Sequence, residues 1–219
     1  MENKINYKTI QNYIDLLIPS SSLFLEELFL TAQKEHIPVI TRETRRFLEV
    51  LLSLCKPQRI LEIGTAVGYS AIVFATVLPQ AQITTIEVEE ALAERARENI
   101  KKAGVSHQIQ VIHDDARNVL PYLTTPFDFV FLDAAKGQYT EYDPFVKKLL
   151  RPGGVLLSDN VLFKGLVAET HPVQKNKRSL VEDLTNYNRG LMADKGYLTT
   201  LLPVGDGLAL SYKKMEEQE

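Results

Sequence analysis

The feature that most constrains the fold is a change of sequence pattern near residue 59. Before it, apolar residues recur at helical spacing in three segments, residues 10–17, 23–35 and 41–54. After it, short apolar segments of strand length alternate with helical ones. Such alternation is typical of a parallel sheet whose faces are covered by helices. The sequence therefore predicts an α/β fold that carries extra helices at its N-terminus.

The expected elements can be placed along the chain. Five strands that would pair in parallel are expected at residues 59–63, 82–87, 109–112, 127–133 and 155–159. The main helices between and after them are expected at residues 89–103, 139–150 and 175–192. Residues 198–204 and 208–212 flank Gly205-Asp206-Gly207, which predicts an antiparallel C-terminal hairpin. We predict one domain over residues 1–219, with N-terminal helices in 1–54 and the core in 58–213.

Composition excludes several classes of protein. The 219 residues are 45% apolar, which is enough for one sizeable core, and the net charge of −3 gives no global attraction for polyanions. Cys55 is the only cysteine, so an intramolecular disulfide and a cysteine-based zinc site are both impossible. The sequence has neither a signal-peptide pattern at its start nor an apolar run long enough for a bilayer. We therefore expect a cytoplasmic protein with no membrane contact.

The richest candidate site follows the first expected strand. Gly64 and Gly68 would let the backbone approach a ligand closely, at the start of the next helix. Glu87 ends the second strand, where a carboxylate can accept both hydroxyls of a ribose. The loop has neither G-x-G-x-x-G nor G-K-S/T, and Glu62 precedes it, so a pyrophosphate would be poorly received. A cationic or zwitterionic adenosine ligand suits this loop better. Two glycines after a strand can also form a simple tight turn with no ligand.

Acidic residues also follow two later strands. Asp133 comes after residues 127–132, and Asp159-Asn160 comes after residues 155–158. If these strands are neighbours, two carboxylates and one amide oxygen converge. Oxygen ligands favour Mg²⁺, Mn²⁺ or Ca²⁺ over zinc. The alternative is structural, with Asp133 capping a helix and Asp159-Asn160 forming a turn.

Residues 61–70, Leu-Glu-Ile-Gly-x-x-x-Gly-Tyr-Ser, resemble the donor-binding motif of class I S-adenosylmethionine-dependent O-methyltransferases of the catechol and caffeoyl-coenzyme A type. The resemblance extends over residues 37–212 and implies a Rossmann-like, mostly parallel seven-stranded sheet. It also implies that the methionine part of the donor is bound by Glu62, Gly64, Tyr69 and Ser70. By the same resemblance, Glu87 binds the ribose, and Asp115 and Ala116 bind the adenine. Ile40 belongs to the same implied pocket but stands where many relatives carry methionine, and Asp114 stands where closer relatives carry glycine.

The same resemblance assigns the chemistry. It implies that Asp133, Asp159 and Asn160 bind the metal, that Asp133 also borders the donor, and that Asp133 and Lys136 serve catalysis. A bound cation would stabilise the acceptor's alkoxide and align it with the methyl group. Lys136 would help remove the proton or stabilise the anion. A lysine in a loop can also be merely solvated, so we rank it below the metal ligands.

Three segments, residues 133–139, 159–169 and 203–209, resemble bacterial tRNA 5-hydroxyuridine methyltransferases more closely. That resemblance implies methylation of the wobble base in the tRNA anticodon loop to 5-methoxyuridine, and a homodimer. Single-stranded loop bases can be splayed into a pocket. A phosphate-binding patch could come from two groups of basic residues, Arg42, Arg45 and Arg46, and Lys164, Lys175, Lys177 and Arg178.

Two other functions remain open at this stage. The first is O-methylation of a small catechol-like molecule, for which aromatic side chains should close the pocket around the metal. The second is a non-catalytic sensor of an adenosine ligand. A sensor has no need of a hydroxyl-activating cation, so Asp133, Asp159, Asn160 and Lys136 argue against it.

Overall fold

The structure, a computed structural model, describes residues 5–169 and 174–215. Its secondary-structure elements are α1 (Lys8–Leu17), α2 (Leu23–Lys34), α3 (Arg42–Cys55), β1 (Arg59–Ile63), α4 (Tyr69–Val77), β2 (Gln82–Glu87), α5 (Glu90–Lys102), β3 (Ile109–His113), α6 (Ala116–Val119), η1 (Leu120–Tyr122), β4 (Phe127–Leu132), η2 (Lys136–Gln138), α7 (Tyr139–Leu149), β5 (Leu150–Ser158), η3 (Phe163–Ala168), η4 (Lys175–Lys177), α8 (Arg178–Ala193), β6 (Tyr197–Leu202) and β7 (Leu208–Lys213). The expected fold class is confirmed. The four residues at each end and residues 170–173 of the expected single domain lie outside the described part.

The seven strands form one sheet in the order β3-β2-β1-β4-β5-β7-β6. Strands β1 to β5 pair in parallel, whereas β7 pairs antiparallel with both β5 and β6. The expected C-terminal hairpin is confirmed, with β7 inserted between β5 and the edge strand β6. Because the strand order reverses between β1 and β4, the carboxyl ends of these two strands border the crevice where open α/β sheets bind ligands.

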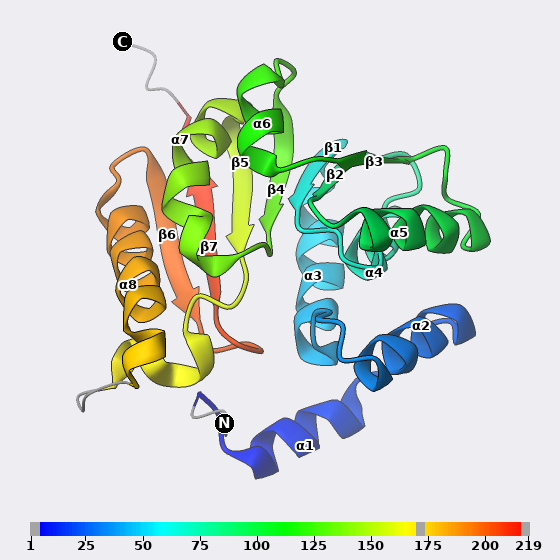
Figure 1. The fold of residues 1–219 in the computed structure, drawn as a ribbon, viewed down its shortest axis with the longest axis horizontal. Coiled ribbons are helices and arrows are strands. Elements are labelled where there is room, and N and C mark those ends of the chain that lie inside the picture. Colours follow the sequence, from blue (N-terminus) through cyan, green and yellow to red (C-terminus); the bar gives the residue numbers. More distant parts are fainter. Residues whose placement is uncertain (1–4, 170–173, 216–219) are drawn as a thin grey trace.

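Alternating side chains of the strands build two cores. In β1, Ile60 faces the core shared with α2 to α5, whereas Leu61 and Ile63 face the core shared with α6 to α8. This alternation follows from the two-residue period of a strand, and burial on both faces explains why apolar residues predominate in β1 and β4. Figure 1 shows α1 lying apart from the sheet, beside α2 and α3.

Local signals in the sequence set the helix ends. The hydroxyls of Ser22 and Thr41 accept hydrogen bonds from backbone amides in the first turns of α2 and α3, as N-caps do. Two of the expected starts were wrong by three residues or more. Strand β5 begins at Leu150 rather than Val155, because Leu150 already pairs with Phe127 before a bulge in the register. The last long helix begins at Arg178, after a 3-10 turn over Lys175–Lys177.

Candidate active site

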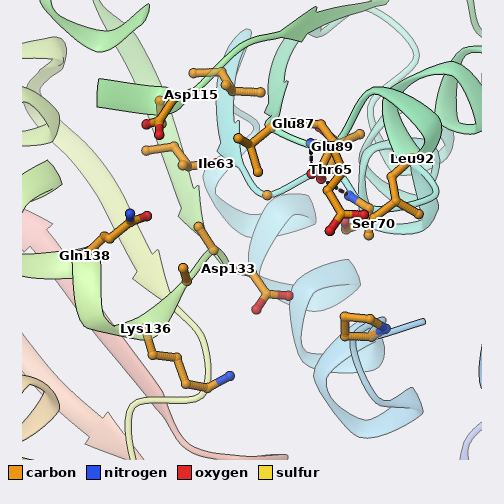
Figure 2. A pocket seen from close by; sticks show the side chains of 18 of the residues that line it. Ile63, Thr65, Ser70, Glu87, Glu89, Leu92, Asp115, Asp133, Lys136 and Gln138 are labelled. Carbon is orange, nitrogen blue, oxygen red and sulfur yellow. Dashed lines mark hydrogen bonds between the residues drawn. The ribbon is translucent and has the colours of Figure 1, made fainter. Parts of the chain in front are cut away.

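A cavity of about 550 Å³ opens at the carboxyl ends of β1, β2 and β4 (Figure 2). This volume lies within the range of small-molecule sites. Its lining includes most of the residues expected from the sequence: Ile40, Gly64, Tyr69, Ser70, Glu87, Asp115, Ala116, Asp133, Lys136 and Asn160. The structure therefore brings the expected donor-binding and cation-binding residues to one cavity, with Glu62 and Asp159 as the two that do not line it.

Gly64 controls how closely β1 and β4 approach each other beneath the cavity. Its φ of 102° lies in a region that L side chains rarely adopt, and a Cβ there would lie 2.1 Å from the carbonyl oxygen of Asp133. The amide of Asp133 in turn donates to the carbonyl of Ile63 at 3.0 Å. Only glycine allows the loop after β1 to pack this tightly against the residue after β4.

Glu62 was expected to bind the donor directly. It is fully buried beneath the cavity floor instead and does not line the cavity. The Ser70 hydroxyl donates to one of its carboxyl oxygens, and the Thr85 hydroxyl donates to the other at 2.6 Å. Burial raises the pKa of Glu62 to about 8 despite these two hydrogen bonds. Glu62 therefore fixes the position of the Ser70 hydroxyl, and Ser70 lines the cavity.

Glu87 ends β2 at the cavity wall and is 7% exposed. One of its oxygens accepts a hydrogen bond from the amide of Ala66 at 2.7 Å, and the other accepts one from the amide of Glu89 at 3.0 Å. Ala66 has a φ of 45°, an unusual value for alanine that this hydrogen bond helps to hold. Glu87 thus orders the glycine loop and still presents its carboxylate to the cavity.

Asp115 and Ala116 form the far wall of the cavity at the start of α6. Asp115 is the N-cap of this short helix and forms an ion pair with Arg117 at 2.6 Å. Hydrogen bonds from the Arg117 side chain and backbone lower the pKa of Asp115. Asp115 is therefore a fixed, ionised acceptor, and such a group can receive an exocyclic amine from a bound base.

Asp133 and Asp159 come directly after the last ladder pair of β4 and β5, Leu132 with Ser158. Asp159 is only 2% exposed, and its carboxylate accepts a hydrogen bond from the amide of Asn160, whose φ of 59° turns the chain toward the cavity. Burial raises the pKa of Asp133 to about 6. Burial, and then repulsion from Asp133, raises the pKa of Asp159 well above its usual range.

These two carboxyl groups fit a cation site. None of the ion pairs among the described residues involves either carboxylate, so their desolvation is not offset by a salt bridge with a side chain. Within the same part of the chain, no three His, Cys, Asp or Glu side chains cluster to hold a metal. A cation here would have two carboxylates and the Asn160 amide oxygen as protein ligands. Such a set suits a hard cation that keeps several waters.

Lys136 lies in η2, three residues after Asp133. In Figure 2 the side chains of Asp133 and Lys136 extend from the segment after β4 into the same space. The positive charge of Lys136 counteracts the rise in the pKa of Asp133. The ammonium group is therefore near enough to interact with an anion formed at this end of the cavity.

The match to a family model decides the class of protein. Residues 19–214 match the model described as O-methyltransferase. The chain belongs to the O-methyltransferase family. This confirms the resemblance and the class of enzyme that the sequence predicted.

Relatives of this O-methyltransferase cover most or all of its length. It is 32% identical to a catechol O-methyltransferase of Niastella koreensis, over 98% of this chain and 100% of that one. It is 34% identical to a caffeoyl-CoA O-methyltransferase of Populus kitakamiensis, over 75% and 74% of the two chains. The O-methyltransferase TomG of Streptomyces achromogenes, solved in complex with SAM, superposes with a TM-score of 0.83 at 30% identity, over 98% and 100% of the two chains.

The O-methyltransferase also has cavity residues that the sequence analysis missed. Pro38 and Val39 from the loop before α3, Thr65, Leu92 of α5, Gln138 and Tyr142 all line the cavity. Thr65 lies inside the loop between Gly64 and Gly68 but carries no signal of its own. The other five lie in segments without glycine spacing or paired acids, and only the Pro at position 38 hints at a fixed loop. Among the described helices, none is long and apolar enough to cross a membrane.

Proposed function

We propose that this O-methyltransferase binds S-adenosylmethionine in the cavity at the ends of β1, β2 and β4. The observation that carries the proposal is that one cavity joins the Glu87 carboxylate and the Ser70 hydroxyl to the acidic end of β4. Glu87 can accept from the ribose hydroxyls, and Asp115 can accept from the adenine amine. The donor's cationic sulfonium would then lie toward Asp133. The SAM complex of TomG, which has the same fold, supports this assignment.

We further propose that Asp133, Asp159 and Asn160 hold a divalent cation, Mg²⁺ in the first instance, with Mn²⁺ and Ca²⁺ as alternatives. The bound cation would supply Lewis-acid stabilisation of an acceptor oxygen. Asp133 borders both sites, so it would fix the acceptor close to the methyl group. Lys136 would take up or stabilise the negative charge that the acceptor hydroxyl develops when it loses its proton.

For the acceptor we propose 5-hydroxyuridine at the wobble position of tRNA. The cavity lining includes the aromatic side chains of Tyr69 and Tyr142, but the lining residues next to the proposed ligands along the chain, Ala134, Ala135, Lys136 and Asn160, are not aromatic. Exposed Lys164 lies four residues after Asn160. Helix α8, which begins at Arg178 directly after Lys175 and Lys177 of η4, packs against both η2 and η3. These basic residues support contacts with the phosphates of an anticodon loop.

O-methylation of a small catechol-like molecule is the second candidate. The specific observation in its favour is the relative of 32% identity named a catechol O-methyltransferase, which matches this chain over nearly its whole length. A catechol and a 5-hydroxyuridine both offer two adjacent oxygens to one cation. The cation chemistry is therefore common to both candidates, and only the acceptor separates them.

The deciding experiment incubates the enzyme and Mg²⁺ with labelled S-adenosylmethionine and either tRNA lacking 5-methoxyuridine or catechol. We expect nucleoside analysis of the tRNA to yield labelled 5-methoxyuridine, and Asp159→Ala to yield none. Methylation of catechol without methylation of tRNA would establish the second candidate. Donor binding without methylation of either acceptor would favour a sensor.

We also propose that the enzyme is a homodimer that acts in the cytoplasm. The N-terminal region exposes a group of large apolar side chains, namely Tyr7, Ile10, Tyr13, Leu16 and Leu17. Apolar surface of this kind commonly marks an interface. Sedimentation should give the mass of two chains, and Leu16→Glu should shift it toward one. The single Cys55, with no possible intramolecular disulfide, is compatible with a reducing compartment.

A further inference from the structure

Tyr139 lies behind the proposed cation site and is fully buried. It is the first residue of α7 and directly follows the η2 turn. Its hydroxyl donates to the carbonyl oxygen of Asp159 at 3.0 Å and makes a longer contact of 3.4 Å with that of Leu132. One side chain thus contacts the chain at the exit of β4 and at the exit of β5.

These contacts lie beyond the point where the sheet holds the two strands together. The ladder between β4 and β5 ends at Leu132 and Ser158, followed by one hydrogen bond from the Asp159 amide to the Leu132 carbonyl at 2.9 Å. Past this bond the chains lead into two different loops. The Tyr139 hydroxyl adds a second connection, because it contacts the carbonyl oxygen of Leu132 at the end of β4 and donates to the carbonyl oxygen of Asp159.

We propose that Tyr139 is a positioning residue that sets the distance between the Asp133 and Asp159 carboxylates so that both can bind one cation. The inference rests on the cation site proposed above. Mg²⁺ demands nearly ideal octahedral geometry, so a small change in the separation of two ligands costs affinity. Groups that orient metal ligands without touching the metal often matter almost as much as the ligands. Tyr139 would act through the backbone on both sides of the site.

The test is Tyr139→Phe, which keeps the ring and removes only the hydroxyl. Mn²⁺ binding is measured by calorimetry, in parallel with S-adenosylhomocysteine binding. We expect Mn²⁺ affinity to fall by about 10- to 100-fold, the usual range for loss of a group that orients a ligand. Affinity for S-adenosylhomocysteine, which lacks the sulfonium charge, should change far less, because Ser70, Glu87 and Asp115 do not depend on the Tyr139 hydroxyl.

The matched control is Tyr187→Phe. Tyr187 is also buried, its ring packs against that of Tyr139 with centroids 5.3 Å apart, and its hydroxyl bonds to the Ser158 side chain at 2.7 Å. Removing this hydroxyl costs a comparable buried hydrogen bond but leaves the exits of β4 and β5 connected. We expect a lower melting temperature with wild-type Mn²⁺ affinity.

Three results would overturn the inference in distinguishable ways. Wild-type Mn²⁺ affinity in Tyr139→Phe would show that the hydroxyl does not position the carboxylates. Equal loss of affinity in both tyrosine variants would indicate general loosening of the core instead. Absence of Mn²⁺ binding to the wild-type protein would remove the proposed cation site, and this inference with it.

Discussion

Replacing Glu62 with glutamine should change how the stability of this O-methyltransferase depends on pH. Because burial raises the pKa of Glu62 from 4.5 to about 8, the folded chain keeps a proton that the unfolded chain releases above about pH 4.5. The stability linked to this proton is fully present below pH 4.5 and is lost as the pH rises through 8. At about 1.4 kcal/mol for each pKa unit, the free energy of unfolding loses about 5 kcal/mol in total over this pH range.

The measurement is the free energy of unfolding in urea for the wild-type and Glu62→Gln proteins, between about pH 5 and about pH 8.5 with a chelator present. Glutamine cannot titrate. As the pH rises, the free energy of unfolding of the wild-type protein should therefore fall relative to that of the variant by about 1.4 kcal/mol for each pH unit. Glu98→Gln, at an exposed position of α5, controls for the change in formal charge. Parallel pH profiles for wild type and Glu62→Gln would refute the burial argument.

Three further predictions concern the site itself. Asp159→Ala should abolish turnover that depends on a divalent cation while calorimetry still detects donor binding; unchanged turnover would refute its role as a ligand. Gly64→Ala should destabilise the chain by more than the roughly 1 to 3 kcal/mol of a strained φ alone, because its Cβ would also meet the Asp133 carbonyl at 2.1 Å. Thermal melting measures this loss of stability, and calorimetry measures donor binding by the same variant. A wild-type melting temperature would contradict this packing. Alanine at both Lys175 and Arg178 should weaken tRNA binding and flatten its dependence on salt; binding that ignores salt would contradict phosphate contacts.

Sequence patterns predicted the fold because they report on burial. Strand β1 has apolar residues on both of its faces since both faces of the sheet are covered, and helix α5 ends before Gly104, whose φ is positive. The insertion of β7 between β5 and β6 was not predicted, because a hairpin pattern shows that two strands pair but not which of them joins the rest of the sheet. The start of β5 at Leu150 could not be predicted, because Pro152 and the glycines after it normally mark a turn.

The candidate site was predictable where chemistry needs an uncommon residue at a strand end. Gly64, Glu87 and Asp133 stand out for that reason, and all three reach the cavity. Glu62 follows the same rule but points into the core, because the two-residue period of β1 turns it away from the cavity. Tyr139 could not be found from the sequence, since a buried tyrosine at a helix start looks like any other core residue.

The central claim is that the acidic ends of β4 and β5 share one cation beside the methyl donor. Crystals grown with Mn²⁺ and S-adenosylhomocysteine, measured at the manganese absorption edge, test it most directly. The account predicts one anomalous peak bonded to oxygens of Asp133, Asp159 and Asn160, next to the sulfur of the bound nucleoside. An occupied donor site with no manganese between those side chains would contradict it.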